Sequence, residues 1–467
     1  MNIVKEKLHY YFFNIAIILG MILIVFSPPM TVPDENTHFL NSYTIADGQI
    51  FLQKSDEKLG KYIPKSVLDF VDGNKSKFAG MDGKKYNFKE YYFNSYLTVD
   101  NEDKVFTSYW SQDINPISYI FSSIGIVVGK ILLSRSVETP FNLLLFGRMF
   151  NLIFYVISMT YAIKISPYYK NSMFLLALMP MSIYLGASIS YDALIIPSMF
   201  LLFAYTLKLQ ESEKIVLKDI IIICFIMFML FSVKQAYAPF ALVLLSIPKK
   251  KFGDNKRYYK IIGTTLVICI VAVIFSQINK SDLFSLQSDS NVNANVALQS
   301  EYLKKNFGIM IPLILKSFVA YKTFYITGFV GTLGQLDTNL PMPLIIIFGL
   351  ILIFVMLVDS FKALKVTINF KLFGLVAAVI FVYFSFRAMY VNWTPLVAPL
   401  YGDTVSGIQG RYFIPIAPFV CGIFANKFLL KYEVINKLMN SNAKFAYFVS
   451  IVFAIITSLT ILLRYWG

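Results

Sequence analysis

The sequence predicts an all-α integral membrane protein, folded as a single polytopic membrane domain over residues 1–467. The chain is 57% hydrophobic and its mean hydropathy is +0.62, values beyond those of an ordinary soluble protein. Apolar runs long enough to cross a bilayer recur along the chain, beginning with residues 10–28. The formal net charge of +15 lies largely in short loops between these runs. This is the positive-inside pattern of a membrane protein, and it argues against nucleic acid as a partner.

The distribution of charge also predicts which loops face the cytoplasm. Segment 249–260 holds six basic residues and one acid, so it is expected to be cytoplasmic. Working backward from this loop places segment 29–115, with ten lysines and thirteen acids, on the outer side. The N-terminus is then cytoplasmic. Counting apolar runs in this way predicts about 11 transmembrane helices in the cell membrane, with the C-terminus outside.

A segment whose two ends lie on the same side of the membrane cannot span it, and this rule identifies two apolar runs that should not cross the bilayer. Both ends of 116–133 fall on the outer side, so this run is expected to be a helix lying on the outer membrane surface. The same argument applies to 307–330, which is interrupted by lysines and glycines. The large first outer loop, 29–140, is thus expected to carry interfacial helices, and a second outer region, 279–340, to carry another.

A further interfacial helix is predicted at 34–50. Apolar residues recur there at helical spacing and are expected to lie on the membrane. These residues are Phe39, Tyr43, Ala46 and Ile50.

Two adjacent acids, Asp34 and Glu35, follow the first apolar run directly and open this predicted helix. Carboxylates in a first helical turn interact favourably with the helix dipole, which is reason enough for their presence. They also stand where polar chemistry meets the outer leaflet, and a carboxylate there can act as a general base. His38 lies one turn further along the same face. It is a supporting candidate, although a polar histidine at the interface is the simpler interpretation.

Other charged and polar residues are predicted at the outer ends of apolar runs, where charge is costly and therefore informative. Arginine recognises phosphate through a planar fork and lysine through a point charge. We therefore expect a site that binds the phosphate of a lipid donor. Its candidate residues are Lys234, Arg387, Gln409, Arg411 and Tyr412, with Asp192 as a further acid. Simpler roles remain open: Asp192 caps its helix, Lys234 and Arg387 extend to the interface, and Arg148 ties helices together.

Several short motifs occur in order along the chain. They are Val32–Phe39 followed by Ala46–Gln49, then Asn115–Tyr119, Gly331–Pro341 and Gln409–Phe413. Together they resemble a bacterial membrane-protein family of unknown function that is placed in the GT-C superfamily of polyprenyl-phosphate-sugar-dependent glycosyltransferases. The resemblance spans nearly the whole chain. Residue 115 departs from the His-Pro-Pro or Pro-Pro-Leu motif that is more usual in such enzymes.

The resemblance implies a fold and a chemistry. The fold would be GT-C-like, and the catalytic acid of the first outer loop would correspond to Asp34, with Glu35 beside it. A second acid in the next outer loop would correspond to Asp192. The expected function is a hexosyl- or pentosyltransferase that uses a polyprenyl-phosphate sugar on the outer face, with a cell-envelope glycan or a lipid-linked molecule as acceptor. No cofactor is certain, and a divalent metal is compatible with the acids.

Two other functions remain open. A flippase or transporter for lipid-linked sugars would need a polar path across the bilayer, and it would be favoured by inverted repeats or paired broken helices, which we do not find. A non-catalytic assembly protein that docks partners through 29–140 would tolerate the loss of charge at Asp34. The sugar, the acceptor and the linkage are not encoded in any motif that we recognise.

Overall fold

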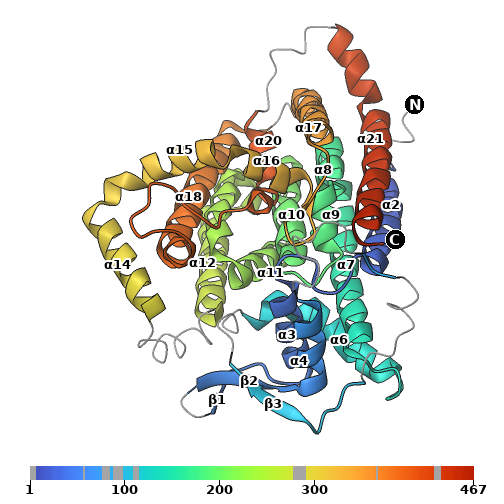
Figure 1. Ribbon diagram of the computed structural model, residues 1–467. Coiled ribbons are helices and arrows are strands. Elements are labelled where there is room, and N and C mark those ends of the chain that lie inside the picture. Colours follow the sequence, from blue (N-terminus) through green and yellow to red (C-terminus); the bar gives the residue numbers. More distant parts are fainter. Residues whose placement is uncertain are drawn as a thin grey trace.

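The computed structural model describes residues 7–55, 58–75, 85–87, 98–108, 115–276, 291–363, 366–424 and 433–466. Within these ranges the chain is mostly helical, with two small antiparallel sheets (Figure 1). Residues 279–290 of the second predicted outer region lie outside the described residues, as do parts of 29–140.

Seven helices in the described part of the chain are long and apolar enough to cross a membrane. Their lengths match the bilayer thickness at the rise of an α-helix. They are α2 (Leu8–Phe26), α7 (Pro140–Ile165), α10 (Asp192–Glu211), α12 (Asn255–Ser276), α17 (Met342–Lys362), α18 (Ile368–Asn392) and α21 (Glu433–Tyr465). The multi-pass membrane protein predicted from hydropathy is thus supported by the fold.

An eighth candidate is broken in the middle. Helices α15 (Met310–Ala320) and α16 (Lys322–Val330) meet at an angle of 69°. They cover most of the predicted surface run 307–330. This geometry fits a broken span or a re-entrant loop, and not one straight interfacial helix.

The count of seven or eight differs from the predicted 11 because several apolar runs do not form long helices. The run 171–187 is divided by Pro180 into α8 (Lys170–Ala177) and α9 (Pro180–Gly186). The run 235–248 forms the 12-residue 3₁₀ helix η2 (Gln235–Ser246) around Pro239, and α11 (Leu217–Val233) has only 17 residues. Among the described residues, the structure therefore supports seven or eight of the predicted crossings.

The region predicted to be the first outer loop combines short helices with a sheet, grouped below the bundle in Figure 1. Strands β1 (Gln53–Ser55), β2 (Lys58–Pro64) and β3 (Lys104–Thr107) pair in that order. Helices α3 (Glu35–Ala46) and α4 (Lys65–Asn74) pack with them. A short helix, η1 (Pro116–Tyr119), then leads into α6 (Ile120–Leu132). Together these two cover the predicted run 116–133, which is shorter than the helices that qualify as spans.

The predicted membrane face of residues 34–50 is wrong. Phe39 and Tyr43 are fully buried inside the protein, and the Phe39 ring packs edge-on against Phe70 of α4. Of the four apolar residues in the predicted membrane face, only Ile50 is exposed, and Ala46 is half-buried. The apolar stripe was read correctly as a helix, but α4 and the small sheet cover it instead of lipid.

Segments distant in sequence converge at the end of the bundle where α2 finishes. Helices α2 and α21 lie side by side (Figure 1), and the indole N–H of Trp466 donates to the carbonyl of Phe26 at 2.8 Å. A hairpin of β4 (Thr332–Leu333) and β5 (Thr338–Asn339) lies at the same end of the bundle. Its Gln335 side chain donates to the carbonyl of Met30. We call this end of the bundle the Asp34 end.

Candidate functional site

Asp34 immediately precedes α3 and adopts a left-handed backbone conformation, with φ 62°. Aspartate tolerates this region better than most residues. Its carbonyl accepts hydrogen bonds from the amides of Thr37 and His38 and so begins the helix. The carboxyl side chain is 60% exposed. The turn therefore leaves an accessible carboxylate at the surface of the site.

Arg411 lies opposite this carboxylate, and its Nη2 is 2.9 Å from Oδ2 of Asp34. It belongs to the short helix η5 (Gly410–Phe413), which lies directly on α16. That contact requires glycine at 410, because a Cβ atom there would stand 2.1 Å from the carbonyl oxygen of Tyr325. The Arg411 side chain is only 1% exposed, and within the described part of the chain its Nε and Nη1 groups donate no hydrogen bond.

Two further charged residues complete the cluster. Asp192, the first residue of α10, is buried with Oδ2 3.6 Å from Nη1 of Arg411. Lys234 connects α11 to η2, and its ammonium lies 3.9 Å from the ring centre of Tyr412 and 5.5 Å from that of Tyr191. Tyrosine faces stabilise a cation that is partly removed from water. We refer to Asp34, Asp192, Lys234 and Arg411 as the charge cluster.

The electrostatics of the charge cluster favour an ionised Asp34. Desolvation raises the pKa of its carboxyl, but the Arg411 guanidinium, with smaller contributions from His38 and Lys234, outweighs this and holds the pKa below its usual value. Asp34 is therefore a carboxylate at neutral pH. A guanidinium beside it that has N–H groups not engaged in hydrogen bonds is suited to receive an additional anion.

His38 lies on the inner side of Asp34, one helical turn along α3. Its Nδ1 atom is 2.8 Å from the hydroxyl of Tyr119 in η1, and its ring meets that of Tyr191 edge-on at 4.9 Å. Burial lowers the pKa of His38 to about 4, although Asp34 acts in the opposite direction. The imidazole is therefore neutral at physiological pH. A metal site is not formed around it, because no three His, Cys, Asp or Glu side chains gather anywhere in the described ranges.

Glu35 is engaged differently from Asp34. It is fully buried and pairs with Arg148 of α7 through two bonds, Nε to Oε1 at 2.8 Å and Nη2 to Oε2 at 2.6 Å. The amides of Met30 and Ile189 donate to the same two oxygens. Arg148 also donates to the carbonyls of Ser27 and Pro28. This pair ties α3 to α7 and to the end of α2, and it leaves Glu35 no exposed oxygen for a substrate.

The remaining predicted residues are placed unequally. Tyr412 belongs to the cluster through its ring beneath Lys234. Gln409 precedes η5, is half-buried, and has a side-chain oxygen without a hydrogen-bond partner in the described structure. Arg387 is half-buried on α18, and among the described residues it forms no ion pair with the cluster.

Sequence reasoning missed the aromatic frame of the site. Tyr191 and Tyr119 contact His38, while Tyr237 donates its hydroxyl to the carbonyl of Tyr412 at 3.0 Å. Of these residues, only Tyr119, as the end of the Asn115–Tyr119 motif, and Tyr412, as a candidate, were named from the sequence. The available signal was proximity in sequence, since Tyr191 and Tyr412 directly adjoin the charged residues Asp192 and Arg411.

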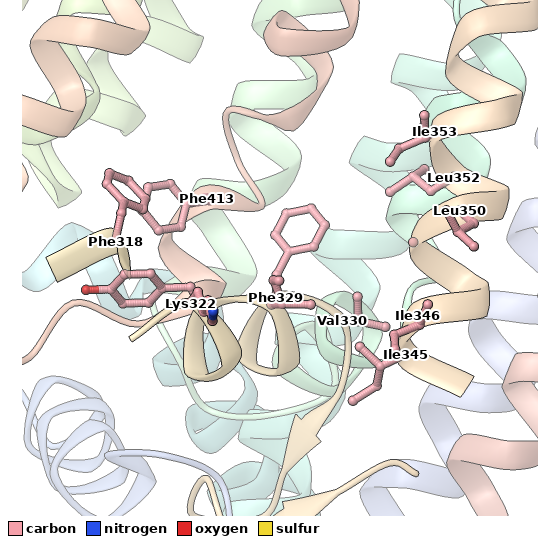
Figure 2. Close-up of a pocket in the computed structure, with 13 residues that line it drawn as sticks. Phe318, Lys322, Phe329, Val330, Ile345, Ile346, Leu350, Leu352, Ile353 and Phe413 are labelled. Atoms are coloured by element: carbon pink, nitrogen blue, oxygen red, sulfur yellow. The ribbon is translucent and has the colours of Figure 1, made fainter. Parts of the chain in front are cut away.

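An apolar groove of about 590 Å³ adjoins η5 at Phe413. It runs between α16 and α17, with Phe413 and Phe318 at one side and Phe329 in the middle (Figure 2). Among the described residues that line it, Lys322 alone is charged. Thus Arg411 and Phe413, two residues apart on one short helix, border the charge cluster and the groove respectively.

Comparison with known proteins gives a family for this chain. Residues 17–420 match the family model described as a predicted membrane protein, DUF2142. Neither the curated proteins nor the solved structures gave a match. The match covers most of the chain and includes every residue of the charge cluster. The chain therefore belongs to the DUF2142 family of predicted membrane proteins.

Proposed function

We propose that this protein is a membrane glycosyltransferase of GT-C type. It transfers a sugar from a polyprenyl-phosphate carrier to a cell-envelope glycan or a lipid-linked acceptor. The observation that carries the proposal is the exposed Asp34 carboxylate held against a buried Arg411, beside an apolar groove; among the described residues, Nε and Nη1 of Arg411 donate no hydrogen bond. Such a reaction needs an ionised base for the acceptor hydroxyl, a cation that binds the phosphate, and an apolar groove for the lipid chain.

Arg411 is the proposed phosphate ligand, with Lys234 as the second cation. The Nε and Nη1 groups of Arg411 donate no other hydrogen bond in the described structure. A bound phosphate would satisfy these buried donors, which are otherwise costly. The negative phosphate would also partly neutralise the positive charge of the guanidinium. The pKa of the Asp34 carboxyl, which that positive charge lowers, would then rise. Binding of the donor would in this way strengthen the base that the reaction requires.

The groove beside η5 is the proposed place for the prenyl chain. Its walls on α16 and α17 are apolar, and α17 is a candidate span, so a lipid can enter from the bilayer. Because the chain would move from lipid into the groove, close packing against the groove walls, and not removal from water, would favour its binding. With the chain in the groove at Phe413, its phosphate would be directed toward Arg411 on the same short helix.

The transfer step then assigns one role to each residue. The acceptor hydroxyl gives its proton to Asp34 as its oxygen forms the new bond to the anomeric carbon. The bond from that carbon to the phosphate oxygen breaks, and the lipid phosphate leaves with the electron pair. Arg411 and Lys234 stabilise the charge that develops on the leaving group. Asp192 holds Arg411 in place or orients the acceptor.

The same proposal includes the membrane orientation. The N-terminus would be cytoplasmic and the Asp34 end would face outward, because the basic segment 249–260 is expected on the cytoplasmic side; this segment comprises η3 (Lys249–Phe252) and the start of α12. The residues of the first outer loop, 29–140, would then sit beside the outer leaflet with the charge cluster. The expectation of about 11 crossings would require short helices such as α11 and η2 to contribute to the membrane domain.

The test is sugar transfer by the purified protein in lipid nanodiscs. Labelled polyprenyl-phosphate hexoses and pentoses serve as donors, and a cell-envelope extract serves as acceptor. Asp34→Asn should lower the rate by about 10²–10⁴-fold. Asp69→Asn, at an exposed site on nearby α4, is the matched control and should leave the rate unchanged.

Two outcomes would count against the proposal. Equal transfer by the parent and Asp34→Asn would remove Asp34 as the base. Transbilayer movement of the labelled lipid in vesicles, without transfer to any acceptor, would instead support the flippase.

A further inference from the structure

The loop that leads into Arg411 is irregular in backbone but firmly attached. Between α19 (Thr394–Val397) and η5, four of its backbone groups are bonded to side chains from four different helices. These bonds are Tyr401 N–H to Gln299 at 3.0 Å, Tyr390 O–H to Gly402 at 3.0 Å, Val405 N–H to Ser317 at 2.8 Å, and Ser406 N–H to Thr394 at 3.1 Å. A loop held in this way is preorganised, which lowers the cost of binding a ligand.

An exposed aromatic side chain stands on this loop in a strained conformation. Tyr401 has φ 61°, a region that bulky residues rarely adopt, yet its side chain is 45% exposed. Its ring lies 4.7 Å from that of Tyr302 on α14 (Asn291–Lys305), tilted by 46°. Core packing does not explain a strained residue whose side chain faces outward. Such outliers occur preferentially where a ligand binds.

Charged side chains lie beside these two rings. Lys316 of α15 and Asp403 of the loop form an exposed pair at 3.3 Å, two residues from Tyr401. Thr404 and Tyr321 place further hydroxyls at this surface, 3.4 Å apart. Burying Lys316 and Asp403 in lipid would require removing two charges from water, which is expensive. A sugar ring, in contrast, presents C–H groups to an aromatic face and hydroxyls to charged neighbours.

We infer that Tyr401, Tyr302, Asp403 and Lys316 form a glycan-binding platform that receives a pyranose ring of the acceptor. This inference deepens the proposed function, because the loop from the platform runs directly to Gln409 and Arg411. The pyranose face stacks on Tyr401, while Lys316 donates to sugar hydroxyls and Asp403 accepts from them. The platform binds the glycan without taking part in the transfer step.

The test measures binding of fluorescein-labelled tetrasaccharides of glucose, galactose, mannose and N-acetylglucosamine to the protein in nanodiscs, by fluorescence polarisation. At least one should bind the parent. Tyr401→Gly should weaken that binding at least tenfold. It should also leave the apparent melting temperature equal or higher, because glycine adopts positive φ without strain. Tyr401→Phe should retain most of the binding.

The readouts separate this inference from the proposed function. Asp34→Asn should bind the tetrasaccharide normally, so a failure of Asp34 in catalysis leaves the platform untouched. Absence of binding to the parent, or unchanged binding by Tyr401→Gly, would overturn the platform. So would quenching of a Tyr401→Trp variant by brominated lipids, since that result would assign Tyr401 to the membrane surface.

Discussion

Asp34 and Arg411 are separated by 377 positions in the chain, and their side chains meet at 2.9 Å. The contact joins the start of α3 to η5, the short helix before α20 (Ala417–Ile423). It pairs an exposed carboxylate with a buried guanidinium. Such asymmetry is expected where one partner must stay available to a substrate while the other is held rigidly.

Arg411 should be needed for both stability and donor binding. Arg411→Gln leaves Asp192 buried without its cation, which costs about 3–5 kcal/mol. The apparent melting temperature in detergent should fall. The double variant Arg411→Gln with Asp192→Asn should recover part of the loss, because no charge is then left unpaired. Equal melting temperatures for the single and double variants would show that the two residues are not coupled.

Glu35 and Asp34 should respond oppositely to loss of charge. Glu35→Gln leaves Arg148 buried with an uncompensated charge and should destabilise the fold by about 3–5 kcal/mol. Asp34→Asn, at an exposed side chain, should change the melting temperature little while reducing transfer. Reduced transfer by a fully stable Glu35→Gln variant would instead place Glu35 in the chemistry.

His38 should make stability depend on pH. Burial lowers its pKa from 6.5 to about 4, so the folded state prefers the neutral ring. The associated stability is complete above pH 6.5 and is lost as the pH falls from 6.5 toward 4, by about 3 kcal/mol in total. Denaturation curves of His38→Gln should lack this part of the decline. An identical pH dependence in parent and variant would contradict the assignment.

The groove between α16 and α17 can be filled without disturbing the fold. Gly349 lines it, and a Cβ atom there would meet nothing within 4 Å. Gly349→Phe should raise the KM for long-chain polyprenyl donors roughly tenfold, equivalent to about 1.4 kcal/mol of lost binding. Short-chain donors should be affected less. Gly263→Phe on α12 is the matched control, since its Cβ position is equally open. Equal KM changes in both variants would remove the groove as the lipid site.

Much of the site could be found from sequence because charge near a membrane is costly and stands out in an apolar chain. Asp34, Asp192, Lys234 and Arg411 were selected on that ground, and the structure brings them together. Arg387 was selected by the same argument, but among the described residues it forms no ion pair with the charge cluster. The free-energy cost of charge near a membrane identifies charged residues at the ends of helices. It does not reveal how a helix is rotated about its axis, and therefore which neighbours its side chains face.

The sequence by itself determined that this is a helical, multi-pass membrane protein with acids and bases gathered at the ends of its helices. Those properties follow from composition, run length and local charge. Only the tertiary structure decided that Glu35 is locked to Arg148 while its neighbour Asp34 stays exposed, and that Phe39 faces α4 instead of lipid. Both outcomes depend on contacts between distant segments, and such contacts leave no mark in local periodicity or composition.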